Sequence, residues 1–215
     1  MRVATRIIRL ILELRQSGIT DTRVLSAIER VPRTRFVPGA LRHQAYANVA
    51  VPIGHGQTLS RPLVVAQMTE ALDVGPRMKV LEVGTGSGYH TAVLAQLCRR
   101  VYTIERHRPL SVHAENRLRE LRLHNVTSKV GDGTLGWPEQ APFDRILVAA
   151  AAAEAPAPIL AQLAVGGILV LPIGVQGRDQ SLLRVRRTEA GYDSDWLSAV
   201  RFVPLLPGIG AEAVV

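Results

Sequence analysis

Val80-Leu81-Glu82-Val83-Gly84-Thr85-Gly86-Ser87-Gly88 is the stretch that decides the fold. Its first four residues are typical of a buried strand, and the glycines after them predict a tight turn that opens a helix at about Tyr89. Glycine suits this turn because the chain must reverse sharply, and because a Cβ would keep a ligand away from the backbone N–H groups at the helix start. Those N–H groups and the helix dipole favour an anionic group on the ligand.

The pattern of apolar runs repeats along the rest of the chain. It predicts strands at 79–83, 100–104, 126–130, 144–149 and 167–172, separated by helices near 89–98, 109–122 and 156–164. Two alternating segments, Ser181–Arg187 and Trp196–Val203, follow without a long helix between them. The sequence therefore predicts an α/β fold with a doubly wound, mostly parallel Rossmann-like sheet, helices on both faces and an antiparallel edge.

The first part of the chain predicts a helical extension. Apolar residues at helical spacing give one helix that ends near Gly18 and a second one, capped by Thr20 or Asp21, that stops at Pro32. Residues 49–60 hold a proline and two glycines and predict a long structured loop. Pro62 then begins a helix that runs to Leu72.

The charge of the chain is unevenly distributed. It has 24 arginines, only 2 lysines and a net charge of +8, of which +6 falls in residues 1–42. One hypothesis is a basic arm for nucleic acid; the alternative, which we favour, is a pair of amphipathic helices with a solvated arginine face.

A cytoplasmic, reduced setting is expected because Cys98 is the only cysteine, so no intrachain disulfide can form. Its apolar surroundings, 92–98, indicate a buried structural thiol. Charged residues interrupt every apolar run near the N-terminus, so no signal peptide is expected. The uncharged stretch Ala155–Gly177 contains prolines and a glycine pair, which favours a helix, a turn and a buried strand over a membrane span.

The glycine turn also indicates a cofactor. Its G-x-G-x-G spacing with Glu82 ahead resembles the first motif of S-adenosylmethionine-dependent methyltransferases, whereas the NAD fingerprint is G-x-G-x-x-G. Glu105 ends the second strand, where a carboxylate can accept from both ribose hydroxyls, and Asp132, before Gly133, ends the third, where it can accept from the adenine amino group. NAD would also use Glu105, so the turn spacing and Asp132 favour S-adenosylmethionine.

The reacting group must lie elsewhere. After the fourth strand the chain reads Val148-Ala149-Ala150-Ala151, which lacks the motif that grips a flipped base, and Cys98 is misplaced for cytosine chemistry. The segment Ile53–Pro62 remains. Its hydroxyl at Ser60 has two possible roles, a cap for the next helix or a contact with substrate.

Six blocks in order identify a family. They are Ile53-Gly54-x-Gly56-Gln57-Thr58-Leu59-Ser60-x-Pro62, Met68-Thr69-Glu70, Leu81 to Tyr89, Gly131-Asp132-Gly133, Ala141-Pro142-Phe143-Asp144 and Phe202-Val203-Pro204-Leu205. Together they resemble protein-L-isoaspartate O-methyltransferase over nearly the whole chain. The first and last blocks are much more specific than the glycine turn.

The resemblance implies an enzyme that methylates the α-carboxylate of L-isoaspartyl residues in damaged proteins, which starts their repair, and that converts S-adenosyl-L-methionine to S-adenosyl-L-homocysteine. It implies Ser60 as the catalytic residue that holds the carboxylate. The cofactor-binding residues it implies are Thr58, Leu59, Ser60, Glu82, Gly84, Thr85, Gly86, Gly88, Glu105, Asp132 and Gly133. The substrate-binding residues are Ile53, Gly54, Ser60, Val203, Pro204 and Leu205, of which the last three would offer an extended edge to the peptide.

Elementary chemistry agrees with this activity. A carboxylate is ionised near neutral pH, so its attack on a sulfonium methyl group needs alignment but no general base. The expected partners are isoaspartate-containing proteins and peptides, without metal or membrane, and nucleic acid is not expected. The chain departs from the family pattern at three places: Asn48 replaces a common acid, His90 replaces a frequent glutamine, and alanines fill 149–153 where a threonine is common.

We expect a single methyltransferase domain over residues 1–215. It comprises N-terminal helices and a substrate loop (1–75), a cofactor-binding core (76–178), and C-terminal edge strands with a tail (179–215). Two alternatives stay open: a dedicated peptide aspartate O-methyltransferase, which generally carries added segments, and a noncatalytic protein that binds nucleic acid through residues 1–42.

Overall fold

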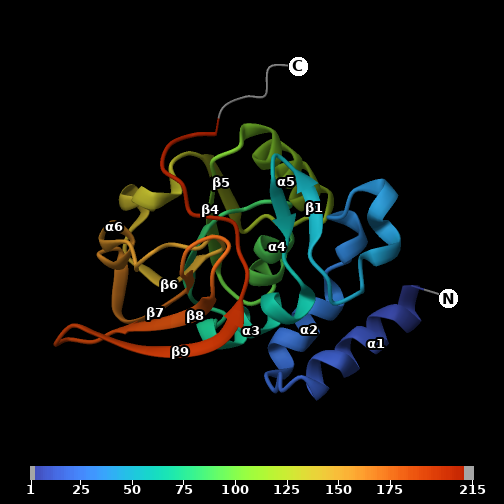
Figure 1. The fold of residues 1–215 in the computed structure, drawn as a ribbon, viewed down its shortest axis with the longest axis horizontal. Helices are drawn as coiled ribbons and strands as arrows, with labels where there is room; N and C mark the ends of the chain where they lie inside the picture. Colours follow the sequence, from blue (N-terminus) through green and yellow to red (C-terminus); the bar gives the residue numbers. More distant parts are fainter. Residues whose placement is uncertain (1–2, 211–215) are drawn as a thin grey trace.

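A seven-stranded sheet forms the centre of the computed structural model, which describes residues 3–210 (Figure 1). Five parallel strands pair in the order β5-β4-β3-β6-β7, and β8 and β9 continue the sheet antiparallel beyond β7. The strands are β3 (Lys79–Val83), β4 (Arg100–Glu105), β5 (Val126–Val130), β6 (Phe143–Val148), β7 (Leu163–Ile173), β8 (Gln180–Arg187) and β9 (Tyr192–Val200). The predicted mostly parallel sheet with an antiparallel edge is confirmed.

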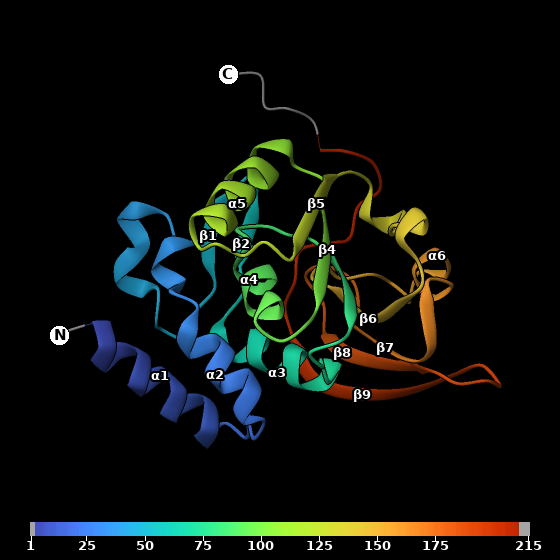
Figure 2. The same cartoon turned by 180° about the vertical axis from the view of Figure 1, so that it is seen from behind.

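Helices cover the two faces of the sheet unequally. On one face lie α3 (Pro62–Leu72), α4 (Tyr89–Ala95) and α5 (Arg108–Glu120), and α1 (Val3–Gln16) and α2 (Thr22–Arg30) pack outside them (Figure 2). The other face carries the short α6 (Ala157–Leu160) and 3₁₀ turns. The helix predicted near 156–164 is therefore too long, because Leu163 already pairs with Phe143 of β6.

Alternate residues of the parallel strands point to opposite faces and supply two apolar layers. In β3, Val80 packs with Met68 of α3 and Leu94 of α4, whereas Leu81 packs on the other face with Ile159 of α6. Cys98 joins the first layer, and burial raises the pKa of its thiol to about 12. The prediction of a buried structural thiol is confirmed.

The segment predicted as a long loop contains a β-hairpin. β1 (Val51–Gly54) pairs antiparallel with β2 (Gln57–Leu59) through the two-residue turn His55-Gly56, whose φ angles are 53° and 68°. Positive φ at both positions is the pattern of a type I′ turn, which suits the twist of a two-stranded ribbon. The loop prediction was wrong because short strands that contain proline and glycine have the composition of a loop.

The helix ends show which side chains act as caps. Asp21 caps α2 by accepting a hydrogen bond from the Arg23 N–H, while Thr20 donates to Glu70 instead. At the start of α3, the Leu63 N–H donates to Asn48 Oδ1 at 3.2 Å, and the residue at the cap position, Arg61, makes no side-chain capping bond. Asn48 therefore caps α3, which is the role that the capping hypothesis assigned to Ser60.

The stretch Ala155–Gly177 contains α6 and the whole of β7, in agreement with the predicted helix and buried strand. Within residues 3–210, none of the helices combines the length and the apolar character that crossing a membrane requires.

Candidate active site

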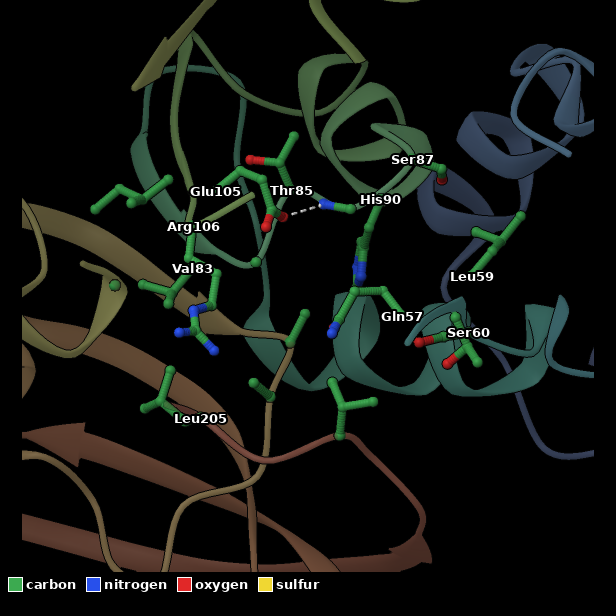
Figure 3. A pocket seen from close by; sticks show the side chains of 18 of the residues that line it. Gln57, Leu59, Ser60, Val83, Thr85, Ser87, His90, Glu105, Arg106 and Leu205 are labelled. Atoms are coloured by element: carbon green, nitrogen blue, oxygen red, sulfur yellow. Dashed lines mark hydrogen bonds between the residues drawn. The ribbon is translucent and has the colours of Figure 1, made fainter. Parts of the chain in front are cut away.

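A cavity lies at the carboxyl edge of the parallel strands, where Val83 of β3 is in register with Ile104 of β4 and Val148 of β6. Its walls come from this edge, from the β1–β2 hairpin and from the segment after β9 (Figure 3). Of the predicted site residues, it brings together Thr58, Leu59, Ser60, Gly84, Thr85, Gly86, Glu105, Gly133, Val203, Pro204 and Leu205. Glu82, Gly88, Asp132, Ile53 and Gly54 do not line it.

The glycine turn bends back onto β4. Gly84 and Thr85 donate their N–H groups to the Ile104 carbonyl, and Gly86 donates to Glu105. These N–H groups have partners inside the protein, so the expectation that they receive an anionic ligand is not met at these positions. Gly88 has φ 87°, and a Cβ there would lie 3.1 Å from the Ala114 Cβ, so this glycine allows the close packing of α5.

Glu105 holds the turn and also faces the cavity. Its Oε2 accepts from the Gly86 N–H at 2.8 Å and its Oε1 accepts from the His107 N–H at 2.9 Å. The residue is 4% exposed. Each carboxylate oxygen can accept two hydrogen bonds, so each keeps one acceptor site for a ligand hydroxyl. The pair of oxygens predicted to bind a ribose is thus fixed in orientation by the backbone.

Glu82 acts beneath the turn rather than inside the cavity. Its Oε2 accepts hydrogen bonds from the hydroxyls of Thr91 and Thr103, and the Thr103 hydroxyl lies 2.6 Å from that of Thr85. Since Thr103 gives its proton to Glu82, Thr85 is the donor in the last pair. The prediction of a direct cofactor contact by Glu82 does not fit this structure, because its side chain is fully buried and tied to the turn through Thr103 and Thr85.

Burial dominates the charge state of Glu82. It raises the pKa of this carboxyl to about 7, a shift that the nearby Glu105 increases and the two threonine hydrogen bonds oppose. The carboxyl therefore titrates near neutral pH.

Ser60 lies at the other end of the cavity from Glu105, with His90 and Gln57 between them (Figure 3). Its backbone carbonyl accepts a hydrogen bond from Nη2 of Arg33 at 2.6 Å. Thr58 and Ser60 also line a second hollow, so these two residues are shared by both hollows. Ile53 belongs to β1 of the hairpin, and its Cδ1 would be 3.4 Å from a Cβ at Gly86.

The segment after β9 crosses the carboxyl edge of the sheet and ends beside β5 (Figure 1). Asp132 accepts from the Thr134 N–H and hydroxyl with Oδ1, and from the Gly208 N–H with Oδ2 at 2.7 Å. Burial would raise the pKa of Asp132, but the hydrogen bonds from Thr134 and Gly208, together with the charge of Arg106, lower it. The predicted adenine contact by Asp132 stays a prediction, with one oxygen already in use by the segment.

Residues 203–205 have one of their edges occupied. The Ala151 N–H donates to the Val203 carbonyl, and the Leu205 N–H donates to the Ala151 carbonyl. Their opposite edge carries the carbonyl of Pro204 but no N–H, because proline has none. The strand predicted to reach Val203 ends at Val200. That residues 203–205 bind the substrate peptide stays a prediction. On their free edge they can offer the peptide only a hydrogen-bond acceptor, the carbonyl of Pro204.

Several cavity residues were not among the predicted site residues: Gln57, His90, Arg106, Ala149 and Ala150. Gln57 lies inside the family block, and Arg106 and Ala149 each follow the last residue of a strand, so position at a strand end is a signal for both. Arg106 donates to the carbonyls of Pro207 and Gly208 and so holds the crossing segment in place.

His90 is neutral in this site. Its Nε2 lies 2.9 Å from the Thr69 hydroxyl, which donates to the Val65 carbonyl, so the imidazole Nε2 carries the proton and donates to Thr69. Burial, and secondarily the charge of Arg33, lower the pKa of His90 to about 3. The His90 side chain therefore acts as a neutral hydrogen-bond donor to Thr69.

The arrangement suits the transfer of a group between two ligands held side by side. A carboxylate at one end, a hydroxyl at the other and apolar walls between them can orient a polar cofactor and shield its reacting atom from water. Among the described residues, no group of three or more His, Cys, Asp or Glu side chains is placed to hold a metal ion.

Comparisons with known proteins identify the family to which this chain is similar. The sequence model of the family described as protein-L-isoaspartate(D-aspartate) O-methyltransferase (PCMT) matches residues 6–209. The protein-L-isoaspartate O-methyltransferase of Rhodospirillum centenum is 57% identical over 214 residues, which cover 99% of this chain and 97% of that protein. That of Rhodospirillum rubrum is 59% identical over 211 residues, which cover 97% of this chain and 96% of the relative.

Solved structures are also similar to this chain over most of its length. One protein-L-isoaspartate O-methyltransferase superposes with a TM-score of 0.84 at 25% identity, over 95% of this chain and 67% of that one. A Plasmodium falciparum structure, described as a putative protein-L-isoaspartate O-methyltransferase in complex with S-adenosyl-L-homocysteine, gives a TM-score of 0.79 at 26% identity. That match covers 92% of this chain and 97% of the other.

Proposed function

The chain belongs to the protein-L-isoaspartate(D-aspartate) O-methyltransferase family, and we propose that it performs the family's reaction at the junction of the two hollows beside Ser60. The reaction is the transfer of a methyl group from S-adenosyl-L-methionine to the α-carboxylate of L-isoaspartyl residues in damaged proteins. The observation that carries the proposal is the position of Ser60, which lines both hollows, while Asn48 and not Ser60 caps α3.

The cavity residues fit S-adenosyl-L-methionine. Glu105 keeps acceptor sites for two ribose hydroxyls, and its orientation is set by the N–H groups of Gly86 and His107. A Cβ at Gly84 would lie 3.4 Å from the Ala149 Cβ and narrow the floor of the cavity. When bound, the cofactor supplies an electrophilic methyl group on a sulfonium. Thr58, Leu59 and Ser60 would cover it from the hairpin side.

The residues of this chain then act by orientation. The substrate carboxylate is already ionised at neutral pH, so no side chain needs to remove a proton. A hydroxyl at Ser60 can donate to one carboxylate oxygen and leave the other free to attack. Arg33, through the Ser60 carbonyl, fixes the backbone that carries this hydroxyl. Alignment of this kind can supply several kcal/mol of a barrier, roughly 7–11 in well-oriented systems.

The substrate assignment is tested by labelled methyl transfer to paired peptides that differ only in isoaspartate or aspartate at one position. We expect label in the isoaspartyl peptide and background levels in the aspartyl peptide, with an asparaginyl peptide as the control for nonspecific labelling. Equal labelling of the isoaspartyl and aspartyl peptides would overturn the repair assignment and favour a general peptide aspartate methyltransferase.

We also propose a cytoplasmic enzyme whose macromolecular partners are isoaspartate-containing proteins and peptides. Its sole cysteine is buried, which suits a reducing compartment. The reaction as written needs no metal, since the nucleophile is ionised and the methyl donor is already activated. Part of the basic charge near the N-terminus is paired locally, Arg9 with Glu13 and Arg23 with Asp21, which argues against a nucleic-acid surface there.

A further inference from the structure

The second hollow is a groove of about 590 Å³ that opens beside Ser60. Three arginines line it from three separate parts of the chain: Arg61 ahead of α3, Arg178 in the turn between β7 and β8, and Arg201 directly after β9. These parts converge because β8 begins where β9 ends, Gln180 opposite Val200, and β8 contacts α3 (Figure 1).

The positive charge of this groove is not neutralised from within. Among the described residues, Asp179 is the one acidic residue that lines the groove, and no carboxylate lies within salt-bridge distance of any of the three arginines. Other exposed arginines of the chain do have such partners, for example Arg23 with Asp21 at 2.7 Å. All three groove arginines are exposed to solvent. A hollow lined by one sign of charge raises the local concentration of ligands of the opposite sign.

We propose that this arginine groove (Arg61, Arg178 and Arg201) selects substrates with aspartate or glutamate side chains close to the isoaspartyl residue. This inference rests on the proposed function, because Ser60 fixes where the reacting carboxylate lies. An extended peptide advances about 3.3 Å per residue, so side chains within about three positions of the isoaspartate can reach the groove. The groove thereby gives Arg61, which follows Ser60 in the chain, a role in the choice of substrate.

The test uses three synthetic isoaspartyl peptides that differ only in their neighbouring residues, which are glutamate, glutamine or lysine. We expect kcat/KM to fall in the order glutamate, glutamine, lysine, with only about 10-fold between the extremes, because each exposed ion pair contributes little. The difference should reside mainly in KM and shrink as salt is added, because exposed charges are screened.

The double variant Arg178→Gln/Arg201→Gln should bring the glutamate-to-lysine ratio close to one. Arg77→Gln is the matched control, since Arg77 is an exposed arginine just ahead of β3, at the opposite end of that strand from the site, and it should keep the wild-type ratio. Equal rates on all three peptides would overturn the inference and leave the proposed function intact. A preference that survives in the double variant would overturn the assignment to these arginines. Failure to methylate any isoaspartyl peptide would overturn the proposed function itself.

Discussion

Nη2 of Arg33 donates a hydrogen bond to the backbone carbonyl of Ser60, with the two atoms 2.6 Å apart. Arg33 is fully buried, and its guanidinium carbon lies 4.6 Å from the centre of the Tyr89 ring. Tyr89 is the first residue of α4, directly after the glycine turn. The buried guanidinium of Arg33 therefore contacts both the backbone of Ser60, the residue that we assign to catalysis, and Tyr89 of α4, the helix that follows the glycine turn.

Arg33→Met tests this connection. A buried charge replaced by an apolar side chain of similar length is often neutral or stabilising, so we expect the protein to stay folded with an unfolding free energy that is unchanged or higher. The Ser60 backbone would lose its anchor, and we expect kcat to fall about 10-fold, since small misplacements of reacting groups are costly. Affinity for S-adenosyl-L-homocysteine, measured by calorimetry, should change little.

The control for that variant is Arg35→Met, two residues further along. The side chain of Arg35 is 63% exposed and pairs only loosely with Glu120, at 3.7 Å. Its loss should leave kcat unchanged. If both variants keep wild-type kcat, Arg33 has a purely structural role.

Ser60→Ala and Asn48→Ala separate substrate contact from helix capping. We expect Ser60→Ala to lower kcat on the order of 100-fold with little change in cofactor affinity or melting temperature, because it removes a positioning group without unpairing a cap. Asn48→Ala should do the reverse: it should cost about 1 kcal/mol of unfolding free energy, as loss of a cap does, with a smaller effect on kcat. Methyl-transfer rates and urea denaturation of both variants distinguish the substrate-contact role from the capping role. A Ser60→Ala protein that loses stability rather than rate would restore the capping role.

The central βα unit was predictable from the sequence because its signals are local. An apolar run, three closely spaced glycines and a helix of small apolar residues fix β3, the turn and α4 without help from distant residues. The position of Ser60 at the cavity was predictable through the order of the family blocks, and its catalytic role stays a prediction. The absence of a capping role for its side chain was not predictable. That depends on Asn48, which lies 15 positions before Leu63 and meets it only in the fold.

The parts that were missed depend on long-range contacts. The residues around Glu82 in the sequence are the same whether its carboxylate binds a ligand or a threonine. Its actual partners, Thr91 of α4 and Thr103 of β4, are brought to it only by the fold. Asp132 is bound by Gly208, 76 residues away. The β1–β2 hairpin was missed because Pro52 and two glycines fall within so few residues.

Glu105→Gln should weaken cofactor binding. The carboxylate accepts one backbone N–H on each oxygen, whereas an amide can accept on only one side and would leave the N–H of Gly86 or His107 without a partner. With the loss of a charged acceptor for the ribose, we expect the Kd for S-adenosyl-L-homocysteine to rise roughly 10- to 100-fold, since hydrogen bonds to charged groups contribute about 1.5–3 kcal/mol. Glu120→Gln, a change at an exposed carboxylate, is the matched control. Wild-type affinity in Glu105→Gln would remove Glu105 from the cofactor site.

Glu82 makes the stability of the protein depend on pH near neutrality. Its pKa rises from 4.5 to about 7 on burial, so between these values the unfolded chain has lost the proton that the folded protein keeps. The unfolding free energy should therefore decrease as pH rises from 4.5 to about 7, by up to about 3 kcal/mol for this group alone. Glu82→Gln removes the ionisation and keeps an acceptor for Thr91 and Thr103. We expect it to be more stable than the wild type at about pH 8 and to show a flatter profile above about pH 5, as measured by urea denaturation. A variant that is less stable than the wild type at both pH values would mean that the ionised carboxylate supports the fold.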